Sequence, residues 1–178
     1  PRELKLSPAG ELLISPIDEL KELRLNHKAA SIQLNKGDKS DLFTGGETGS
    51  VEYEIHLKYV EPIELLFSIA FDIDDSEKLT IAITTTEGVV KVDTTTASIE
   101  ENIPGNMKDC PIVDQGNDLS LRLFLDRSVL ELYVNDRAVM SARYYPVNPD
   151  ISNMRAELKS GRDCSIVASC YGLRSIWS

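Results

Sequence analysis

Apolar and polar residues alternate with a period of two along much of the chain, a pattern typical of β-strands that bury one face. The clearest example lies between residues 119 and 146, where three short runs each place an apolar residue at every second position. The apolar positions are Leu121, Leu123 and Leu125, then Leu130, Leu132 and Val134, then Ala138, Met140 and Ala142. The pattern predicts three antiparallel strands joined by two tight turns.

The same alternation predicts the register of these strands, because a slip of one residue would turn a whole apolar set toward water. A two-residue loop, Arg127-Ser128, keeps the apolar residues of the first two strands on one face. At the second turn a two-residue loop would mix the faces, whereas a three-residue loop, 135–137, sets Leu132 opposite Met140. We therefore expect the longer loop, with one residue in the left-handed region that Asn and Asp tolerate better than most residues.

Further strands are predicted by alternation or by continuous apolar runs at 31–34, 51–59, 63–73, 78–86, 88–96, 154–159 and 166–170, the last continuing to Trp177. Two short extended pieces precede Pro16, and 17–25 suits a short helix or an extended linker. Segments 35–50 and 102–117, rich in Gly, Pro and polar residues, are predicted to be loops. About ten evenly spaced strands predict an all-β fold, an antiparallel two-sheet β-sandwich of the jelly-roll or concanavalin-like kind.

Composition narrows the classes of partner. The chain has 178 residues, enough for one domain with a sizeable core, and a formal net charge of −10, which argues against nucleic acid or anionic membranes as partners. It contains no apolar run of 18 residues and no leader with a charged and then apolar segment. Pro1 in place of an initiator Met suggests a processed chain or a fragment, so neither an extracellular nor a cytoplasmic location is indicated.

The three cysteines are expected to be buried and structural. Cys164 and Cys170 lie on one predicted strand, roughly 20 Å apart if extended, which is too far for a disulfide. Only Cys110 could pair with either of them, so at least one thiol is unpaired within a monomer.

No motif for metal, cofactor or nucleophilic chemistry is found. The sequence lacks the glycine-rich phosphate loops, H-E-x-x-H, C-x-x-C and G-x-S-x-G. Asp72, Asp74 and Asp75 do not follow the calcium-loop pattern and are expected to form a solvated turn. His56 falls on the polar face of a predicted strand, where a solvated role is favoured. We therefore predict neither a cofactor nor a metal.

Carbohydrate chemistry is also unsupported by the pattern alone. A glycosidase needs two carboxylates about 5 to 10 Å apart, one of them protonated, and the 29 acidic residues do not identify such a pair. Glu131 and Arg143 are predicted to be diagonal neighbours within reach of an ion pair, which would hold Glu131 ionised and favours a structural role. Sugar binding would need exposed aromatic platforms. The four aromatic residues whose orientation the alternation leaves open, and for which a core or interface role is favoured, are Tyr133, Tyr144, Tyr145 and Trp177.

The central stretch, LRLFLDRSVLELYVNDRAVMSARYYP, resembles the signature of the C-terminal β-sandwich domain of the β-fructofuranosidase family, glycoside hydrolase family 32, which includes invertases, levanases, inulinases and sucrose-6-phosphate hydrolases. The residues that fall on the family pattern, in order, are Asp126, Ser128, Glu131, Asn135, Arg143 and Pro146. The segment PRELKLSPAGELLISPIDELKELR resembles the handover from the family's propeller to its sandwich, and LRSIW resembles its last strand. The usual glycine after the hairpin Asn is replaced by Asp136-Arg137, and the usual Thr of the next strand by Ser141.

The resemblance implies a linker at 1–25 and a β-sandwich domain at 26–178. The family's catalytic residues belong to an N-terminal five-bladed propeller, in W-M-N-D-P-N-G, R-D-P and E-C motifs, and none of these motifs occurs here. We therefore expect no catalytic residue, and a non-catalytic module of an enzyme acting on β-fructofuranosides such as sucrose, levan or inulin. Its expected partner is the propeller of the same protein, with homodimerisation left open.

Two other classes remain open at this stage, a fructan-binding module and a free-standing lectin-like protein. No sugar-binding residue is assigned. The polar residues of the signature, Asp126, Ser128, Glu131, Asn135 and Arg143, are expected to fix turns and register rather than to carry a reaction.

Overall fold

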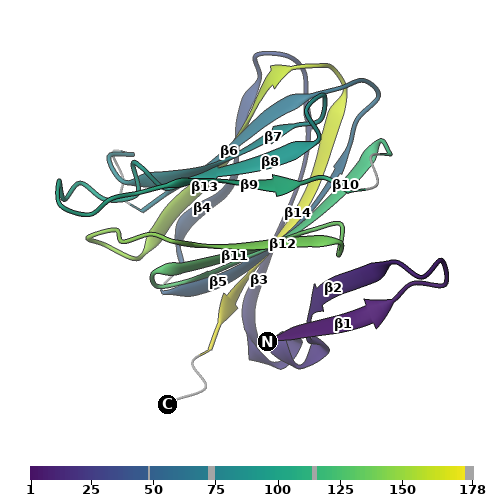
Figure 1. Ribbon diagram of the computed structural model, residues 1–178. Coiled ribbons are helices and arrows are strands. Elements are labelled where there is room, and N and C mark those ends of the chain that lie inside the picture. The colour runs from purple at the N-terminus through teal and green to yellow at the C-terminus, as the bar shows by residue number, and fades with distance from the viewer. Residues whose placement is uncertain (48, 72–74, 114–115, 175–178) are drawn as a thin grey trace.

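Two six-stranded antiparallel sheets pack face to face in the computed structural model (Figure 1). The structure describes residues 1–47, 49–71, 75–113 and 116–174. Sheet I has the order β12-β11-β10-β5-β14-β3, sheet II has the order β4-β13-β6-β7-β8-β9, and β1 and β2 form a separate two-stranded sheet. The predicted all-β fold, an antiparallel two-sheet sandwich, is confirmed.

Each sheet combines strands from distant parts of the sequence. Sheet I contains β3 (Arg24–Leu34), β5 (Ser50–Lys58), β10 (Asp118–Asp126), β11 (Val129–Val134), β12 (Ala138–Arg143) and β14 (Cys164–Leu173). Sheet II contains β4 (Lys39–Glu47), β6 (Glu64–Ala70), β7 (Lys78–Thr84), β8 (Val89–Asp93), β9 (Met107–Pro111) and β13 (Ile151–Ser160). The N-terminal hairpin consists of β1 (Arg2–Leu6) and β2 (Leu12–Pro16), and a 3-10 helix, η1 (Asp18–Leu23), follows it.

The described residues form fourteen strands, so the prediction of about ten was too low. The predicted loops 35–50 and 102–117 were wrong because they contain β4 and β9. These two strands are the opposite edges of sheet II. An edge strand contacts a neighbour on one side only and tolerates Gly, Pro and polar residues, so its alternation is weak. In β4 the consecutive residues Leu42 and Phe43 are both buried, beside a register shift against β13.

The register of the three strands β10, β11 and β12 is as predicted. Leu123 lies opposite Leu132, and Leu132 lies opposite Met140, so the apolar sets of all three strands share the core face. The second turn is the predicted three-residue loop. Two of its residues, Asn135 at φ 53° and Asp136 at φ 51°, are left-handed, where one was expected.

The core fills the space between the sheets with alternate residues of nearly every strand. Tyr53, Phe67 and Phe71 are among its largest fully buried side chains. All three cysteines are buried, as expected, and none of them forms a disulfide with another. Burial raises the pKa of the Cys110 and Cys164 thiols from 9 to about 11.

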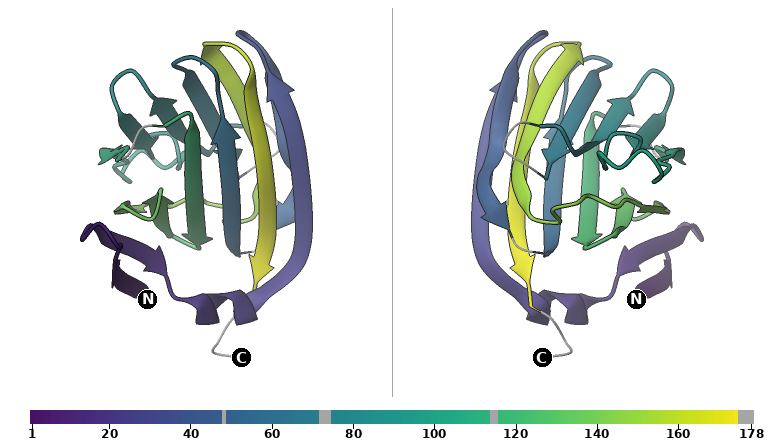
Figure 2. Two further views of the ribbon diagram at one scale, coloured as in Figure 1. Left: turned by 90° about the vertical axis from the view of Figure 1, so that its right-hand side faces the viewer. Right: turned by 90° about the vertical axis from the view of Figure 1, so that its left-hand side faces the viewer.

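The N-terminal segment lies outside the sandwich. The hairpin stands beside the β11–β12 end of sheet I, and η1 connects it to β3 (Figure 2). Of the two alternatives for 17–25, a short helix or an extended linker, the structure has a helix, as six residues of 3-10 helix. No helix within the described ranges is long and apolar enough to cross a membrane.

Candidate functional site

The outer face of sheet I, the face turned away from the core, carries a buried group of charges. The carboxylate of Glu52 on β5 is fully buried and lies between two guanidinium groups. Arg24 donates from Nε to Oε2 at 2.8 Å and from Nη2 to Oε1 at 2.7 Å. Arg122 donates from Nε and Nη2 to Oε1 at 2.8 and 2.6 Å. Glu54, two residues further along β5 on the same face, also accepts a hydrogen bond from Arg24. We call these four residues the arginine clamp.

Aromatic rings on the neighbouring strands flank Glu52 at the centre of the clamp. Glu52 lies opposite Phe124 of β10 on one side and opposite Tyr171 of β14 on the other. The guanidinium carbon of Arg24 lies 4.0 Å from the centre of the Tyr171 ring, a cation–π distance. The hydrogen bonds to Glu52 raise the pKa of Arg24 above its usual range. Because both Glu52 oxygens are occupied by guanidinium donors, the clamp suits a structural role rather than proton transfer.

A second polar group surrounds Glu131 on β11. Arg2 of the hairpin donates from Nε and Nη2 to Oε1 at 2.9 and 2.5 Å, and also to Ser141 Oγ at 2.9 Å. The Tyr133 hydroxyl donates to Oε2 at 2.7 Å. Burial, together with this bond, raises the pKa of Tyr133 above its ordinary value. The predicted Glu131–Arg143 ion pair was wrong, because Arg2 takes the position next to Glu131 and Arg143 donates instead to Ser128 Oγ at 3.2 Å.

The other signature residues lie at the turns. Asp126 accepts from Ser50 Oγ at 2.6 Å, at the end where β5 and β10 pair. Asn135 accepts from the Ser120 amide at 2.8 Å and donates to the Val113 carbonyl at 3.1 Å. These contacts tie each turn to a neighbouring segment, as a turn-fixing role requires, and that role for Asp126, Ser128, Glu131, Asn135 and Arg143 stays a prediction.

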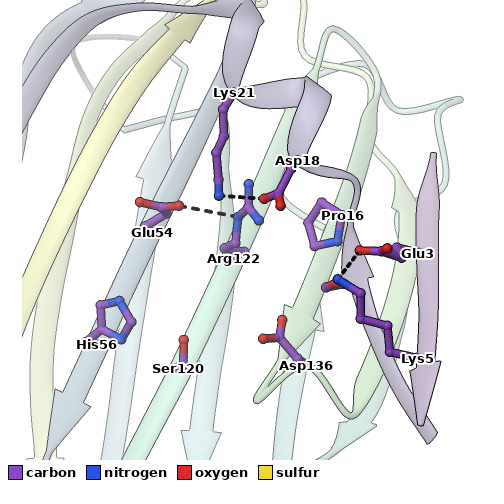
Figure 3. Close-up of a pocket in the computed structure, with 11 residues that line it drawn as sticks. Glu3, Lys5, Pro16, Asp18, Lys21, Glu54, His56, Ser120, Arg122 and Asp136 are labelled. Carbon is purple, nitrogen blue, oxygen red and sulfur yellow. Dashed lines mark hydrogen bonds and ion pairs between the residues drawn. The ribbon is translucent and has the colours of Figure 1, made fainter. Parts of the chain in front are cut away.

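A polar hollow lies between the hairpin and the outer face of sheet I (Figure 3). Its lining residues are Glu3, Lys5, Ser15, Pro16, Asp18, Lys21, Glu54, His56, Ser120, Arg122 and Asp136. The charges largely pair with one another, as Lys5 with Glu3 at 2.6 Å, Lys21 with Asp18 at 2.6 Å and Arg122 with Glu54 at 3.5 Å. Among the described lining residues His56 is the one aromatic ring, so this lining lacks the flat platform on which a sugar stacks.

The structure gives the orientation of three of the four aromatic residues for which the alternation left it open. Tyr133 and Tyr144 are buried, the latter stacked on Phe71 with ring centres 5.2 Å apart. Burial raises the pKa of Tyr144 as well. Tyr145 is 44% exposed, and Trp177 lies outside the described residues.

Metal ligands do not gather in the described ranges, which hold no group of three or more His, Cys, Asp or Glu side chains suited to a metal ion. Of the three aspartates predicted to form a turn, Asp72 and Asp74 lie outside the described residues. Asp75 accepts from Asn153 and Arg155 of β13 at 3.3 and 3.2 Å.

Two buried carboxylates were missed from the sequence. Glu52 lies on the face of β5 that points away from the core, and its burial there depends on Arg24 and Arg122, which are far from it in sequence. Glu77, 2% exposed, accepts from the backbone amides of Ile99 and Val147 and so joins two loops. Glu52 lies near the start of β5 and Glu77 directly precedes β7. Nothing in the local sequence at either position indicates that the carboxylate is buried.

A comparison with known protein families identifies the family to which the chain belongs. The family model described as "Glycosyl hydrolases family 32 C terminal" matches residues 19–169. No curated protein sequence was found to match the chain. Similar solved structures include a fructofuranosidase from Schwanniomyces occidentalis complexed with fructose, a fructan 1-exohydrolase IIa from Cichorium intybus and a sucrose-6-phosphate hydrolase from Lactobacillus gasseri.

These three structures are 12%, 16% and 22% identical to the chain, with TM-scores of 0.72, 0.73 and 0.66. Each match covers 98% of this chain but only 40%, 40% and 33% of the other chain, so the sandwich and its hairpin span less than half of these relatives. At such identities the likeness establishes the fold. The family model, in contrast, covers most of the sequence, and the chain therefore belongs to the family of C-terminal domains of glycosyl hydrolases family 32.

Proposed function

We propose that the chain is the non-catalytic C-terminal β-sandwich module of a glycoside hydrolase that acts on β-fructofuranosides such as sucrose, levan or inulin. Its role is to pack against the catalytic domain of the same protein, a five-bladed propeller, and to stabilise it. The substrate class follows from the names of the solved relatives, which are a fructofuranosidase, a fructan exohydrolase and a sucrose-6-phosphate hydrolase.

The observation that carries the proposal is the outer face of sheet I. Its most buried carboxylate is fixed by two guanidinium groups, and its hollow is lined by charges that pair among themselves. Glycoside hydrolysis needs a free carboxylate pair across a cleft that admits the sugar. A face of fixed, mutually paired charges offers no such free pair, which supports a non-catalytic role.

Hydrolysis by the isolated chain is the direct test of the non-catalytic role. Purified 178-residue chain is incubated with sucrose and with inulin, and released fructose is measured against buffer. We expect no release above buffer. Release at a rate proportional to chain concentration would overturn the proposal.

The stabilising role is tested in the full protein encoded by the gene. Reading the coding sequence upstream of Pro1 should find the propeller motifs, whereas their absence would favour the lectin-like alternative. Removing the sandwich from that protein should lower its thermal midpoint and leave hydrophobic surface that promotes aggregation. An unchanged midpoint contradicts the stabilising role.

Calorimetry separates the remaining alternative, a fructan-binding module. Levan or inulin at millimolar concentration is titrated into the isolated chain. We expect no binding heat, because the described lining of the hollow has no aromatic platform. Saturable heat would assign fructan binding to the sandwich instead.

A further inference from the structure

The buried carboxylate of Glu77 joins two loops that lie far apart in the sequence. The 94–106 loop connects β8 to β9, and the 144–150 loop connects β12 to β13. Glu77 Oε1 accepts hydrogen bonds from the Ile99 amide at 3.0 Å and from the Val147 amide at 2.9 Å. Because one oxygen atom bonds both amides, the two loops lie side by side, at the left of Figure 1, whereas the hairpin lies at its right.

Further contacts fix the backbone of each loop. In the first loop, the Thr94 amide donates to the Asn106 carbonyl at 2.9 Å, and the Asn106 amide donates to Thr94 Oγ1 at 3.0 Å. Gly105 lies so close to Thr94 that a side chain at this position would collide with the Thr94 backbone. In the second loop, Tyr144 is buried and stacked on Phe71. A fixed backbone holds the exposed side chains of both loops in place, which lowers the entropy lost when a partner binds.

These fixed loops expose three large apolar side chains. Ile99 is 59% exposed, Val147 58% and Tyr145 44%. Ile99 and Val147 are neighbours through their shared acceptor, and Tyr145 stands two residues before Val147. Exposed apolar residues that occur singly are common, but a group of three on ordered loops marks a surface that a partner covers. We call Ile99, Tyr145 and Val147 the loop face.

Acidic residues border the loop face. Glu100 and Glu101 follow Ile99 directly and are exposed, and Asp150, partly exposed, follows Val147 in the other loop. Among the residues that the structure describes, neither Glu100 nor Glu101 forms an ion pair. The chain as a whole has a net charge of −10. The potential around the loop face is therefore negative.

This combination of side chains narrows the choice of partner. Sugars stack on flat aromatic rings, whereas two of the three side chains of the loop face are branched aliphatic ones. Anionic membranes are repelled by the acidic border. A second copy of this chain would bring two acidic borders together, and like charges across an interface weaken association. An apolar surface with an acidic border fits a partner whose apolar side chains are accompanied by Lys or Arg.

We propose that the loop face is a docking surface for a separate polypeptide segment that combines apolar side chains with Lys or Arg, and that Glu77 positions this face. The partner's apolar side chains contact the loop face, and its cations pair with Glu100 and Glu101. The inference goes beyond the proposed function and does not depend on it, because it needs only residues of this chain and no catalytic domain.

Peptide titration followed by NMR of the isotope-labelled chain tests the proposal. The probe is a short peptide of alternating Leu and Lys. Its two matched controls are a peptide of alternating Leu and Glu and a peptide of alternating Ser and Lys. We expect saturable shifts of the Ile99 and Val147 amide signals with the Leu-Lys peptide, weakened by added salt, and much smaller shifts with either control.

Each control tests one part of the proposal. Equal binding of the Leu-Glu peptide overturns the basic character of the partner. Equal binding of the Ser-Lys peptide overturns the role of the apolar side chains. Saturable shifts that leave the Ile99 and Val147 signals unchanged overturn the location of the site.

Substitutions locate the site independently. The triple substitution Ile99→Ser, Tyr145→Ser and Val147→Ser should weaken binding of the Leu-Lys peptide roughly tenfold or more, because it removes the apolar contacts. A matched double substitution, Val60→Ser and Val167→Ser, changes side chains that are 65% and 53% exposed elsewhere on the chain and should leave binding unchanged. Both variants should keep the thermal midpoint of the chain, since the changed side chains are exposed. Unchanged binding by the triple variant contradicts the proposal.

The substitution Glu77→Gln tests the positioning role. The amide has the same size but carries an NH2 group in place of one carboxylate oxygen, so it cannot accept all the bonds from both loops. Hydrogen exchange at the Ile99 and Val147 amides should become faster, and the Leu-Lys peptide should bind several-fold more weakly. Unchanged exchange and binding overturn the role of Glu77.

Other occupants of the loop face give different results. A dimer mass in light scattering that the triple substitution abolishes assigns the face to a second copy of this chain and overturns the proposal. In the full protein encoded by the gene, Ile99 and Val147 should be oxidised by hydroxyl radicals as readily as in the 178-residue chain. Protection in the full protein alone assigns the face to another part of that protein and also overturns the proposal. The proposed function is unaffected by any of these outcomes.

Discussion

The two sheets bury similar core faces but differ sharply on their outer faces. The outer face of sheet II carries partly exposed side chains, as in the Thr80, Ala82 and Thr84 row of β7. Sheet I instead carries Glu52, which is fully buried, and Tyr133, which is 1% exposed, although both point away from the core. A charged group is removed from water only where partners offset its lost hydration. The outer face of sheet I is therefore an organised surface, whereas that of sheet II is an ordinary solvated one.

The difference also explains where the hairpin lies. Arg2 and Arg24, which flank the hairpin and η1, find buried or half-buried carboxylates on sheet I. Sheet II has no fully buried carboxylate among its described ion pairs, and some of these pairs are exposed, such as Lys91 with Glu87 at 3.0 Å. Exposed pairs are screened and contribute little to orientation.

Removing the Glu52 side chain should give the largest difference in stability between a substitution on the outer face of sheet I and one on the outer face of sheet II. Glu52→Ala leaves two guanidinium groups without their carboxylate and should destabilise the chain by about 3 kcal/mol, the low end expected for a broken buried pair because both arginines keep some exposure. The matched change on sheet II, Lys91→Ala, should leave the midpoint unchanged. Urea unfolding measures both, and equal midpoints would remove the distinction between the faces.

The core faces, in contrast, should respond alike to alkaline pH. Cys110 on sheet II and Cys164 on sheet I each have a pKa raised from 9 to about 11. Between these values the unfolded chain has lost the thiol protons while the folded chain keeps them, so stability should fall as pH rises. We expect each of the two thiols to contribute a loss of about 2 kcal/mol over pH 9 to 11.

Single substitutions assign that loss. Cys110→Ala and Cys164→Ala should each reduce the slope of unfolding free energy against pH by a similar amount, measured by urea unfolding across the range. A slope that only one of them changes would show that the two core faces are not equivalent.

Tyr133→Phe is expected to have a smaller effect. It removes the hydroxyl that donates to Glu131 at 2.7 Å and should cost about 1 kcal/mol. Thr80→Val removes a hydroxyl from the outer face of sheet II and should cost less, because Val suits a strand as well as Thr does. Thermal unfolding of the two variants gives the comparison, and a larger loss for Thr80→Val would reverse it.

Substitutions in the tight turns of the two sheets should give the smallest difference in stability. Asp136, left-handed at φ 51° in the β11–β12 turn, has a steric cost that Gly88, at φ 66° in the β7–β8 turn, avoids. Asp136→Gly should therefore stabilise the chain by about 0.5 kcal/mol, and Gly88→Asp should destabilise it by about 1 kcal/mol. Chemical denaturation should show shifts of opposite sign, and shifts of the same sign would contradict this explanation.

Alternation predicted the fold class and the register of β10 to β12. It succeeded there because a two-residue period is set by backbone geometry and by one buried face. It failed for β4 and β9, whose place at the edges of sheet II relaxes the need for apolar residues. It also paired Glu131 with Arg143, because the hairpin that brings Arg2 to Glu131 is not visible in a local pattern.

Residues close together in the sequence are enough to predict an antiparallel β-sandwich related to the C-terminal domains of family 32 hydrolases, because both the two-residue period and the signature are local patterns. The burial of Glu52 between Arg24 and Arg122, and the exposure of Leu4, Leu6 and Leu12 on the hairpin, become visible only in the folded chain. Those features depend on contacts between residues that are 28 and 70 positions apart, and on the docking of one segment on another. Pairing across such separations is chosen by the packing of the whole chain, not by the pattern of any one strand.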